Sequence, residues 1–104
     1  MGISKIKSQI GVVNTKSGSS GVSGTCEYSV EGHQVTFQFV VQSKGTSWTV
    51  FAGMPQIPSG IDPVYLGNTN QGNPVCIVRS GGQLQIRTGA ISTTEYFSGS
   101  YICE

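Results

Sequence analysis

The stretch that decides the fold is residues 25–41, which read Thr-Cys-Glu-Tyr-Ser-Val-Glu-Gly-His-Gln-Val-Thr-Phe-Gln-Phe-Val-Val. Within 25–31 and again within 34–41, apolar side chains alternate with polar ones, which is the two-residue period of a strand with one buried face. Gly32 and His33 separate the two segments, as in a tight hairpin turn. The stretch predicts a β-hairpin with a firm register, because a slip of one residue would turn every buried side chain outward.

Further short apolar segments lie on both sides of this hairpin. They predict strands near 9–15, 48–52, 64–66, 75–79 and 83–88, and at 96–97 and 100–103. Pro55, Pro58 and Pro63 lack the backbone N–H of a strand, so we expect 53–62 to cross from one sheet or edge to another. About seven to eight short strands without a helical pattern predict an all-β fold, an antiparallel β-sandwich or jelly roll.

The chain has 104 residues, which is the size of one domain. The segment from Lys16 to Gly24 is rich in glycine and serine and has little apolar surface with which to order itself. We therefore divide the chain into a flexible N-terminal segment or lead-in strand at 1–24 and a β-sandwich head domain at 25–104.

The low charge of the chain narrows the classes of partner. Charged residues make up 11%, below the ~25% of an average soluble protein, which suits a virion or extracellular surface or an oligomer. The six basic residues are scattered, and nucleic-acid binding needs a basic cluster, so we expect no nucleic-acid partner. The apolar runs are far shorter than the ~20 residues of a membrane helix, so we expect no membrane insertion.

The three cysteines, Cys26, Cys76 and Cys103, leave at least one thiol unpaired in any intramolecular scheme. Their spacing matches no zinc pattern, and we expect neither a metal nor a cofactor. The sequence favours three small buried thiols on strands, and a Cys26–Cys103 disulfide is the alternative.

No catalytic motif is present in the sequence. A Gly-x-Ser-x-Gly elbow is absent, and the single histidine, His33, is expected in a solvated turn. Asp62 and Glu95 are the acids of the second half before Glu104, but nothing marks them as the paired carboxylates of a glycosidase. We therefore expect that the protein is not an enzyme.

Three segments occur in a recognisable order between about residues 24 and 103. They contain Trp48, Phe51, Ala52, Met54 and Pro55, then Ser80, Gly81, Gly82 and Leu84, then Ser98, Gly99, Ser100 and Tyr101. This order resembles the C-terminal domains of bacteriophage tail fibre and baseplate structural proteins, although similar segments often have Leu where Met54 stands. The resemblance implies a small β-sandwich head that forms a homotrimer and binds the host cell surface, often a saccharide.

The same resemblance implies the partners and the location. The partners would be two further copies of the chain, other tail or baseplate proteins and a host cell-surface saccharide, with the protein at the tail tip of a virion assembled in the host cytoplasm. A trimer would cover outward-facing apolar side chains such as Val40, Phe51 or Val78. Two alternatives remain open, a purely structural trimerisation cap of a fibre and a monomeric carbohydrate-binding or adhesin module.

The resemblance carries over no binding residues, so the candidate site comes from the residues themselves. Amide side chains both donate and accept hydrogen bonds, which suits sugar hydroxyls, and tyrosine rings offer an apolar face. The polar loop at 67–73 and the adjacent tyrosine therefore give the candidate ligand-binding residues Tyr65, Asn68, Asn70, Gln71 and Asn73. The segment Glu95-Tyr96-Phe97, with its adjacent aromatic residues, is a second candidate and adds Tyr96. An ordinary solvated loop is the alternative, and Trp48 is expected in the core or a subunit interface rather than against a sugar.

Overall fold

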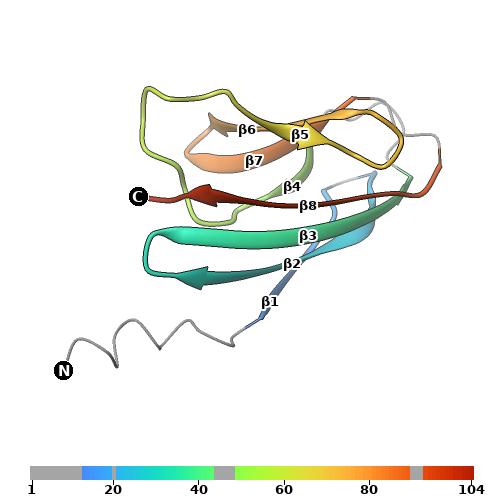
Figure 1. The fold of residues 1–104 in the computed structure, drawn as a ribbon, viewed down its shortest axis with the longest axis horizontal. Helices are drawn as coiled ribbons and strands as arrows, with labels where there is room; N and C mark the ends of the chain where they lie inside the picture. Colours follow the sequence, from blue (N-terminus) through green and yellow to red (C-terminus); the bar gives the residue numbers. More distant parts are fainter. Residues whose placement is uncertain (1–12, 20, 44–48, 90–92) are drawn as a thin grey trace.

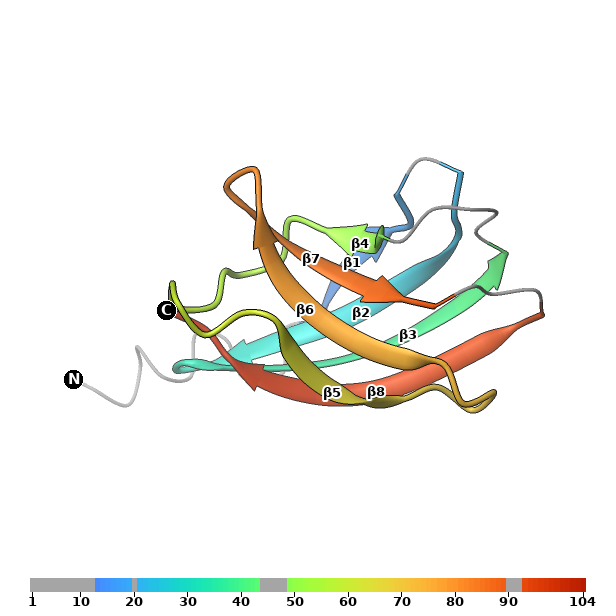
Figure 2. The same ribbon diagram turned by 90° about the horizontal axis from the view of Figure 1, so that it is seen from above.

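The computed structural model describes residues 13–19, 21–43, 49–89 and 93–104 of the chain, and within them it is a sandwich of two antiparallel sheets (Figure 1). Sheet A has the order β1-β2-β3-β8 and consists of β1 (Asn14–Ser17), β2 (Ser23–Glu31), β3 (Gln34–Ser43) and β8 (Glu95–Ile102). Sheet B has the order β4-β7-β6-β5 and consists of β4 (Thr49–Ala52), β7 (Gln83–Thr88), β6 (Pro74–Ser80) and β5 (Val64–Asn68). Figure 2 shows β5, β6 and β7 passing over the strands of sheet A. The predicted all-β sandwich is confirmed.

The predicted hairpin forms the centre of sheet A. β2 and β3 pair in continuous register from Thr25 opposite Val40 to Glu31 opposite Gln34. The alternation of the sequence sets which face each side chain takes, since Cys26 is fully buried while its neighbours on β2 are exposed. The last strand, β8, then pairs along the free edge of β3, although it lies at the other end of the chain.

Sheet B is built from the strands predicted at 75–79 and 83–88, which form a second hairpin, and from two strands beside it. Gly81 and Gly82 join β6 to β7 with φ angles of 59° and 79°, and two successive positive φ values are those of the type I′ turn, which glycine adopts without strain. β4 lies beside β7 and β5 beside β6, which is the order of a Greek key. The strands β4 and β5 are therefore the two edges of this sheet.

The expectation that Phe51 faces outward is wrong. The pairing of β4 with β7 shifts between Thr49 and Phe51, which marks a β-bulge. A bulge inserts one extra residue and interrupts the alternation, so Val50 and Phe51 both face the core and both have no exposed surface. Val40 on β3 does remain exposed, as expected, and Val78 is half-buried.

The core between the sheets contains a cluster of aromatic rings. Phe39 of sheet A packs against Phe51 of sheet B with ring centroids 5.4 Å apart, and this contact links the two layers. Phe37 lies 5.9 Å from Phe97 and 6.0 Å from Tyr101, so three strands contribute to one apolar cluster. Centroid separations of this size are those of favourable tilted ring pairs.

The segment from Gly53 to Pro63 connects β4 to β5 across the whole width of sheet B, as the prolines predicted. Several hydrogen bonds hold it, and three of them fix the stretch from Pro55 to Ile57. The Tyr101 hydroxyl donates to the Pro55 carbonyl at 2.8 Å, the Glu104 N–H donates to the Gln56 carbonyl at 2.9 Å, and the Arg79 guanidinium donates to the Ile57 carbonyl. Residues from β6 and from the end of β8 thus fix this connection.

Part of the predicted N-terminal segment belongs to sheet A. β1 pairs with β2, with Lys16 opposite Cys26, and β2 itself begins at Ser23. Residues 1–12 and 20 lie outside the described residues, and so does most of the strand predicted near 9–15. The described ranges contain no helix of the length and apolar character needed to cross a membrane.

Candidate functional site

The polar loop predicted as a binding site connects β5 to β6 and folds against the start of β8. The Thr69 N–H donates to the Asn73 carbonyl at 2.8 Å and the Gly72 N–H donates to the Thr69 carbonyl at 2.9 Å, which closes the loop on itself. Asn70 pairs with Tyr96, because its N–H donates to the Tyr96 carbonyl at 3.3 Å and its Oδ1 accepts from the Tyr96 N–H at 2.8 Å. The loop at 67–73 and the segment that contains Tyr96, which the sequence analysis identified separately, therefore lie side by side.

Glu95 fastens this loop to β8. Its side chain is 2% exposed and accepts hydrogen bonds from the Thr69 hydroxyl and from Asn73 Nδ2, the latter at 2.9 Å to Oε1 and 2.7 Å to Oε2. Thr69 Oγ1 in turn accepts from the N–H groups of Gln71 at 3.3 Å and Asn73 at 3.2 Å. A buried carboxyl group needs such hydrogen-bond partners. Glu95 therefore has a structural role in holding the loop, and its side chain is not accessible to a ligand.

Four of the six predicted residues divide between the two outer faces of the sandwich. Tyr65 points outward from β5 of sheet B, where its hydroxyl donates to Asn68 Oδ1 at 2.6 Å. Tyr96 points outward from β8 of sheet A, opposite Val40 in the register. The structure thus brings Tyr96 together with Asn70 and places Tyr65 with Asn68 on the other side of the loop.

The two remaining predicted residues have different roles in the loop. Gln71 is exposed at its tip. Asn73 is half-buried and is engaged with Glu95. Asn73 therefore supports the loop, and Gln71 is the one whose side chain is free to meet a ligand.

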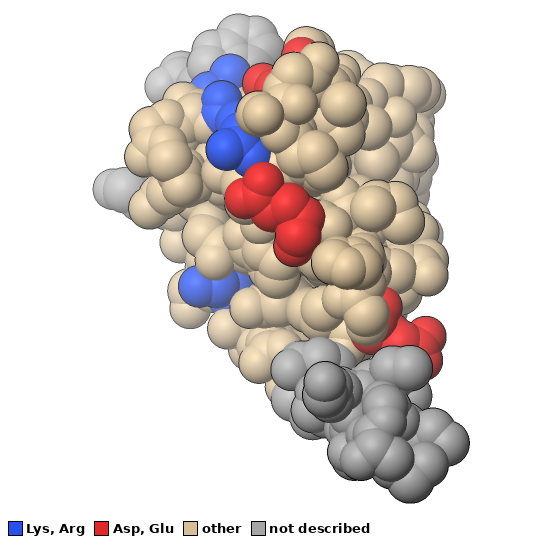
Figure 3. Space-filling model, turned by 90° about the vertical axis from the view of Figure 1, so that its left-hand side faces the viewer, with Lys and Arg blue, Asp and Glu red and all other residues tan. Residues whose placement is uncertain are grey.

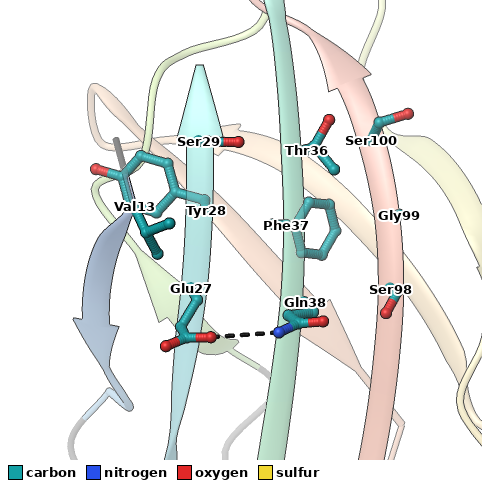
Figure 4. A pocket seen from close by; sticks show the side chains of 10 residues that line it. All are labelled: Val13, Glu27, Tyr28, Ser29, Thr36, Phe37, Gln38, Ser98, Gly99 and Ser100. Carbon is teal, nitrogen blue, oxygen red and sulfur yellow. Dashed lines mark hydrogen bonds between the residues drawn. The ribbon is translucent and has the colours of Figure 1, made fainter. Parts of the chain in front are cut away.

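A groove that the sequence analysis did not identify runs along the outer face of sheet A (Figure 4). It is a hollow of about 460 Å³ that continues into a second hollow of about 280 Å³, and the two share Glu27, Gln38 and Ser98. We call this surface the sheet A groove and define it by the outward side chains Glu27, Ser29, Thr36, Gln38, Ser98 and Ser100, with Val13 beside them and Val40 and Tyr96 at one end. Hollows of this size are typical of ligand sites.

The described lining of the groove contains one charged residue. This residue is Glu27, and its Oε1 accepts a hydrogen bond from Gln38 Nε2 at 3.2 Å. Elsewhere the surface is also weakly charged. Figure 3 views the side of the molecule at the left of Figure 1 and shows a mostly uncharged face with a few acidic and basic side chains, and Arg79 forms an ion pair with Glu104 at 3.4 Å.

The cysteines are free, as the first alternative predicted, but the expectation of three buried thiols on strands is wrong for Cys76, which is not buried, and for Cys103, which follows the end of β8. Cys26 and Cys103 are buried, whereas Cys76 is only half-buried. Burial, together with the nearby Glu27 carboxylate, raises the pKa of the Cys26 thiol to about 12, so this thiol stays protonated and unreactive at neutral pH. Burial likewise raises the pKa of Tyr101 far above its ordinary value, which keeps its hydroxyl a hydrogen-bond donor.

The other residues singled out in the sequence do not form a reactive centre in the described ranges. His33 lies exposed in the β2–β3 turn, and its carbonyl accepts from the Cys103 N–H at 2.7 Å. Asp62 Oδ2 accepts from the Arg79 N–H at 3.4 Å. Trp48 lies outside the described residues. Among the residues that the structure describes, no three His, Cys, Asp or Glu side chains gather as a metal site.

Comparison of the chain with protein families, with curated proteins and with solved structures finds no match. The likeness to phage fibre heads therefore depends on the sequence segments alone, and the site must be argued from its own geometry.

Proposed function

We propose that this protein is a receptor-binding head of a phage tail fibre or baseplate, which attaches the virion to a saccharide on the bacterial surface. It acts by binding rather than by catalysis. The segment order supports this assignment, and an all-β sandwich with little surface charge is consistent with it. The site consists of Tyr96, Asn70 and Gln71 on the side of the loop that faces sheet A.

The observation that carries the proposal is that an exposed tyrosine stands beside a loop whose shape is already fixed. Tyr96 is 54% exposed, and both its N–H and its carbonyl are bonded to Asn70. The loop is held in turn by the buried Glu95, so a ligand does not have to order it, and less affinity is lost on binding. A tyrosine ring stacks on the apolar face of a sugar while amide groups bond to the hydroxyls.

The proposal includes a homotrimer at the tail tip, in contact with other tail or baseplate proteins. A shallow polar site binds one saccharide weakly, and three linked sites strengthen attachment by roughly 100-fold or more when the surface presents many copies. A solution mass of about three times the 10.9 kDa chain, measured by light scattering under reducing conditions, is the result expected of this assembly.

The test is attachment of fluorescently labelled protein to whole bacterial cells and to surface polysaccharide extracted from them. Tyr96→Ala is expected to lower attachment about tenfold, which corresponds to the loss of one stacked ring. Tyr65→Ala is the matched control, because Tyr65 is 64% exposed and contacts the same loop from the opposite face. Gln71→Ala should also lower attachment. Its matched control is Gln83→Ala, which removes an exposed amide at the start of β7.

Three results distinguish this proposal from its rivals. A trimer that attaches to no cell and no polysaccharide would be a structural cap, and receptor binding would be wrong. A monomer that binds saccharide would favour a carbohydrate-binding module outside phage. Equal losses in the Tyr96 and Tyr65 variants would place the site elsewhere on the loop.

A further inference from the structure

We infer that the sheet A groove binds an unbranched polysaccharide without acidic groups, which lies along β3 and β8 with one end at Tyr96. This inference rests on the proposed function and adds to it the place of the chain and the class of sugar. It starts from the outer face of sheet A, because Tyr96 on that face adjoins the two connected hollows.

The shape of the groove suits an extended chain rather than a single sugar ring. The register places Val40 beside Tyr96 at one end, Gln38 beside Ser98 in the middle and Thr36 beside Ser100 at the other end. From residue 36 to residue 40 the strand rises about 14 Å, at ~3.4 Å per residue. The groove therefore runs along the strands over several sugar rings.

The lining suits a ligand made of hydroxyl groups. Four small side chains with hydroxyl groups face the groove, and they are Ser29, Thr36, Ser98 and Ser100. None of these hydroxyl groups forms a hydrogen bond with another described residue. Each hydroxyl donates one hydrogen bond and accepts others, and Gln38 adds an amide. A saccharide chain supplies partners for these groups, whereas an apolar ligand would leave them unsatisfied.

The charge of the groove selects among saccharides. Gln38 Nε2 donates a hydrogen bond to Glu27 Oε1, whereas Glu27 Oε2 has no hydrogen-bond partner among the described residues. Among the described residues no basic side chain belongs to the lining, so a carboxylate, phosphate or sulfate group would face Glu27 without a counter-charge from these residues. Hydroxyl, acetamido and amino groups can instead donate to Oε2. The ligand class is therefore neutral or amino polysaccharide.

A second copy of the chain is a less suitable occupant of this face. If this face met the same face of a second copy, the described lining would bring no basic side chain to pair with Glu27. Two hollow faces also leave empty space between them, and the loss of packing contacts weakens such an interface.

The experiment is binding of the full chain to immobilised linear oligosaccharides of neutral, amino and acidic classes, each printed as a single sugar and as a tetramer. We expect retention on neutral or amino tetramers, weaker retention on the single sugars and none on acidic tetramers. Ser100→Phe fills the groove from an exposed position without touching the core, and it should lower retention about tenfold.

Glu27→Gln tests the charge. It should raise retention on acidic tetramers relative to neutral ones, whereas Glu31→Gln, an exposed acid further along β2 that is not part of the lining, should leave the preference unchanged. Retention of acidic tetramers by the wild-type chain would overturn the inference. So would full retention by Ser100→Phe together with loss in Tyr96→Ala, a result that leaves the proposed function standing.

Two other outcomes are equally decisive. If no saccharide of any class is retained, both the inference and saccharide binding fail. If Ser100→Phe lowers the solution mass by light scattering, the groove is a contact between copies of the chain, and the inference fails while the proposed function survives in the Tyr96 test.

Discussion

Replacing the buried Glu95 by glutamine should destabilise the fold although it changes one atom. The carboxyl group accepts hydrogen bonds at both oxygens, from the Thr69 hydroxyl and twice from Asn73 Nδ2. A glutamine places an NH₂ group at one of these positions, and in either orientation that group faces the Asn73 NH₂. Hydrogen bonds to a charged group contribute ~1.5–3 kcal/mol each, so we expect a loss of about 2 to 4 kcal/mol in the free energy of unfolding.

The assay is urea unfolding followed by tryptophan fluorescence and circular dichroism, with a thermal melt in parallel. The expected loss lowers Tm by roughly 10 to 20 °C in a domain of this size. Glu27→Gln is the matched control, since Glu27 is exposed and accepts one hydrogen bond, so its change should stay within about 0.5 kcal/mol. A Glu95→Gln variant as stable as this control would refute the claim that the hydrogen bonds of Glu95 stabilise the fold.

Two further predictions concern packing and pH. In Gly24→Ala the new Cβ would lie 2.3 Å from the Val40 carbonyl oxygen and 2.9 Å from the Val41 Cα, so the strands must shift at a cost of about 1 to 3 kcal/mol by urea unfolding. A loss no larger than that of the neighbouring exposed Ser23→Ala would contradict this register. The second prediction is alkaline destabilisation. Burial raises the pKa of Cys26 from 9.0 to about 12, so between these values the unfolded chain binds fewer protons than the folded one. Stability should be constant below pH 9 and fall above it, by up to about 1.4 kcal/mol per pH unit for this group, and Cys26→Ala should show a shallower fall. Equal slopes in both proteins would exclude Cys26 as the cause.

Local pattern was enough to predict most strands of the sandwich but not how they pair. The separate strands predicted at 96–97 and 100–103 are one strand, β8, and among the described residues β1 begins later than the strand predicted near 9–15. The alternation in 25–31 and 34–41 predicted β2 and β3 with their buried and exposed faces, because a sheet with one wet face imposes a period of two. The same rule failed at Phe51, where a bulge turns two successive side chains inward. No period reveals an extra residue in a strand before its partner is known.

The candidate site was predicted in composition and only partly in arrangement. The amide loop and the Glu95–Phe97 segment were both identified, but their contact depends on hydrogen bonds between residues more than 20 positions apart. Thr69 was overlooked because a threonine in a loop usually faces solvent, whereas here its hydroxyl donates a hydrogen bond to the buried Glu95. The sheet A groove depends on β8 lying beside β3, and until that pairing is known Thr36 and Ser100 are merely polar residues of separate strands.

The pairing of β3 with β8 also has a consequence for biosynthesis. Phe37 and Phe39 are ready to be buried once the β2–β3 hairpin has emerged from the ribosome, but β8, the strand that completes their sheet, is made only after β4, β5, β6 and β7. A two-stranded hairpin is marginal alone, and its open edge can pair with another nascent chain. Long-range pairing of this kind is also slow. A substitution that delays the docking of β8 should therefore reduce the yield of soluble protein in cells more than it reduces the stability of the purified fold.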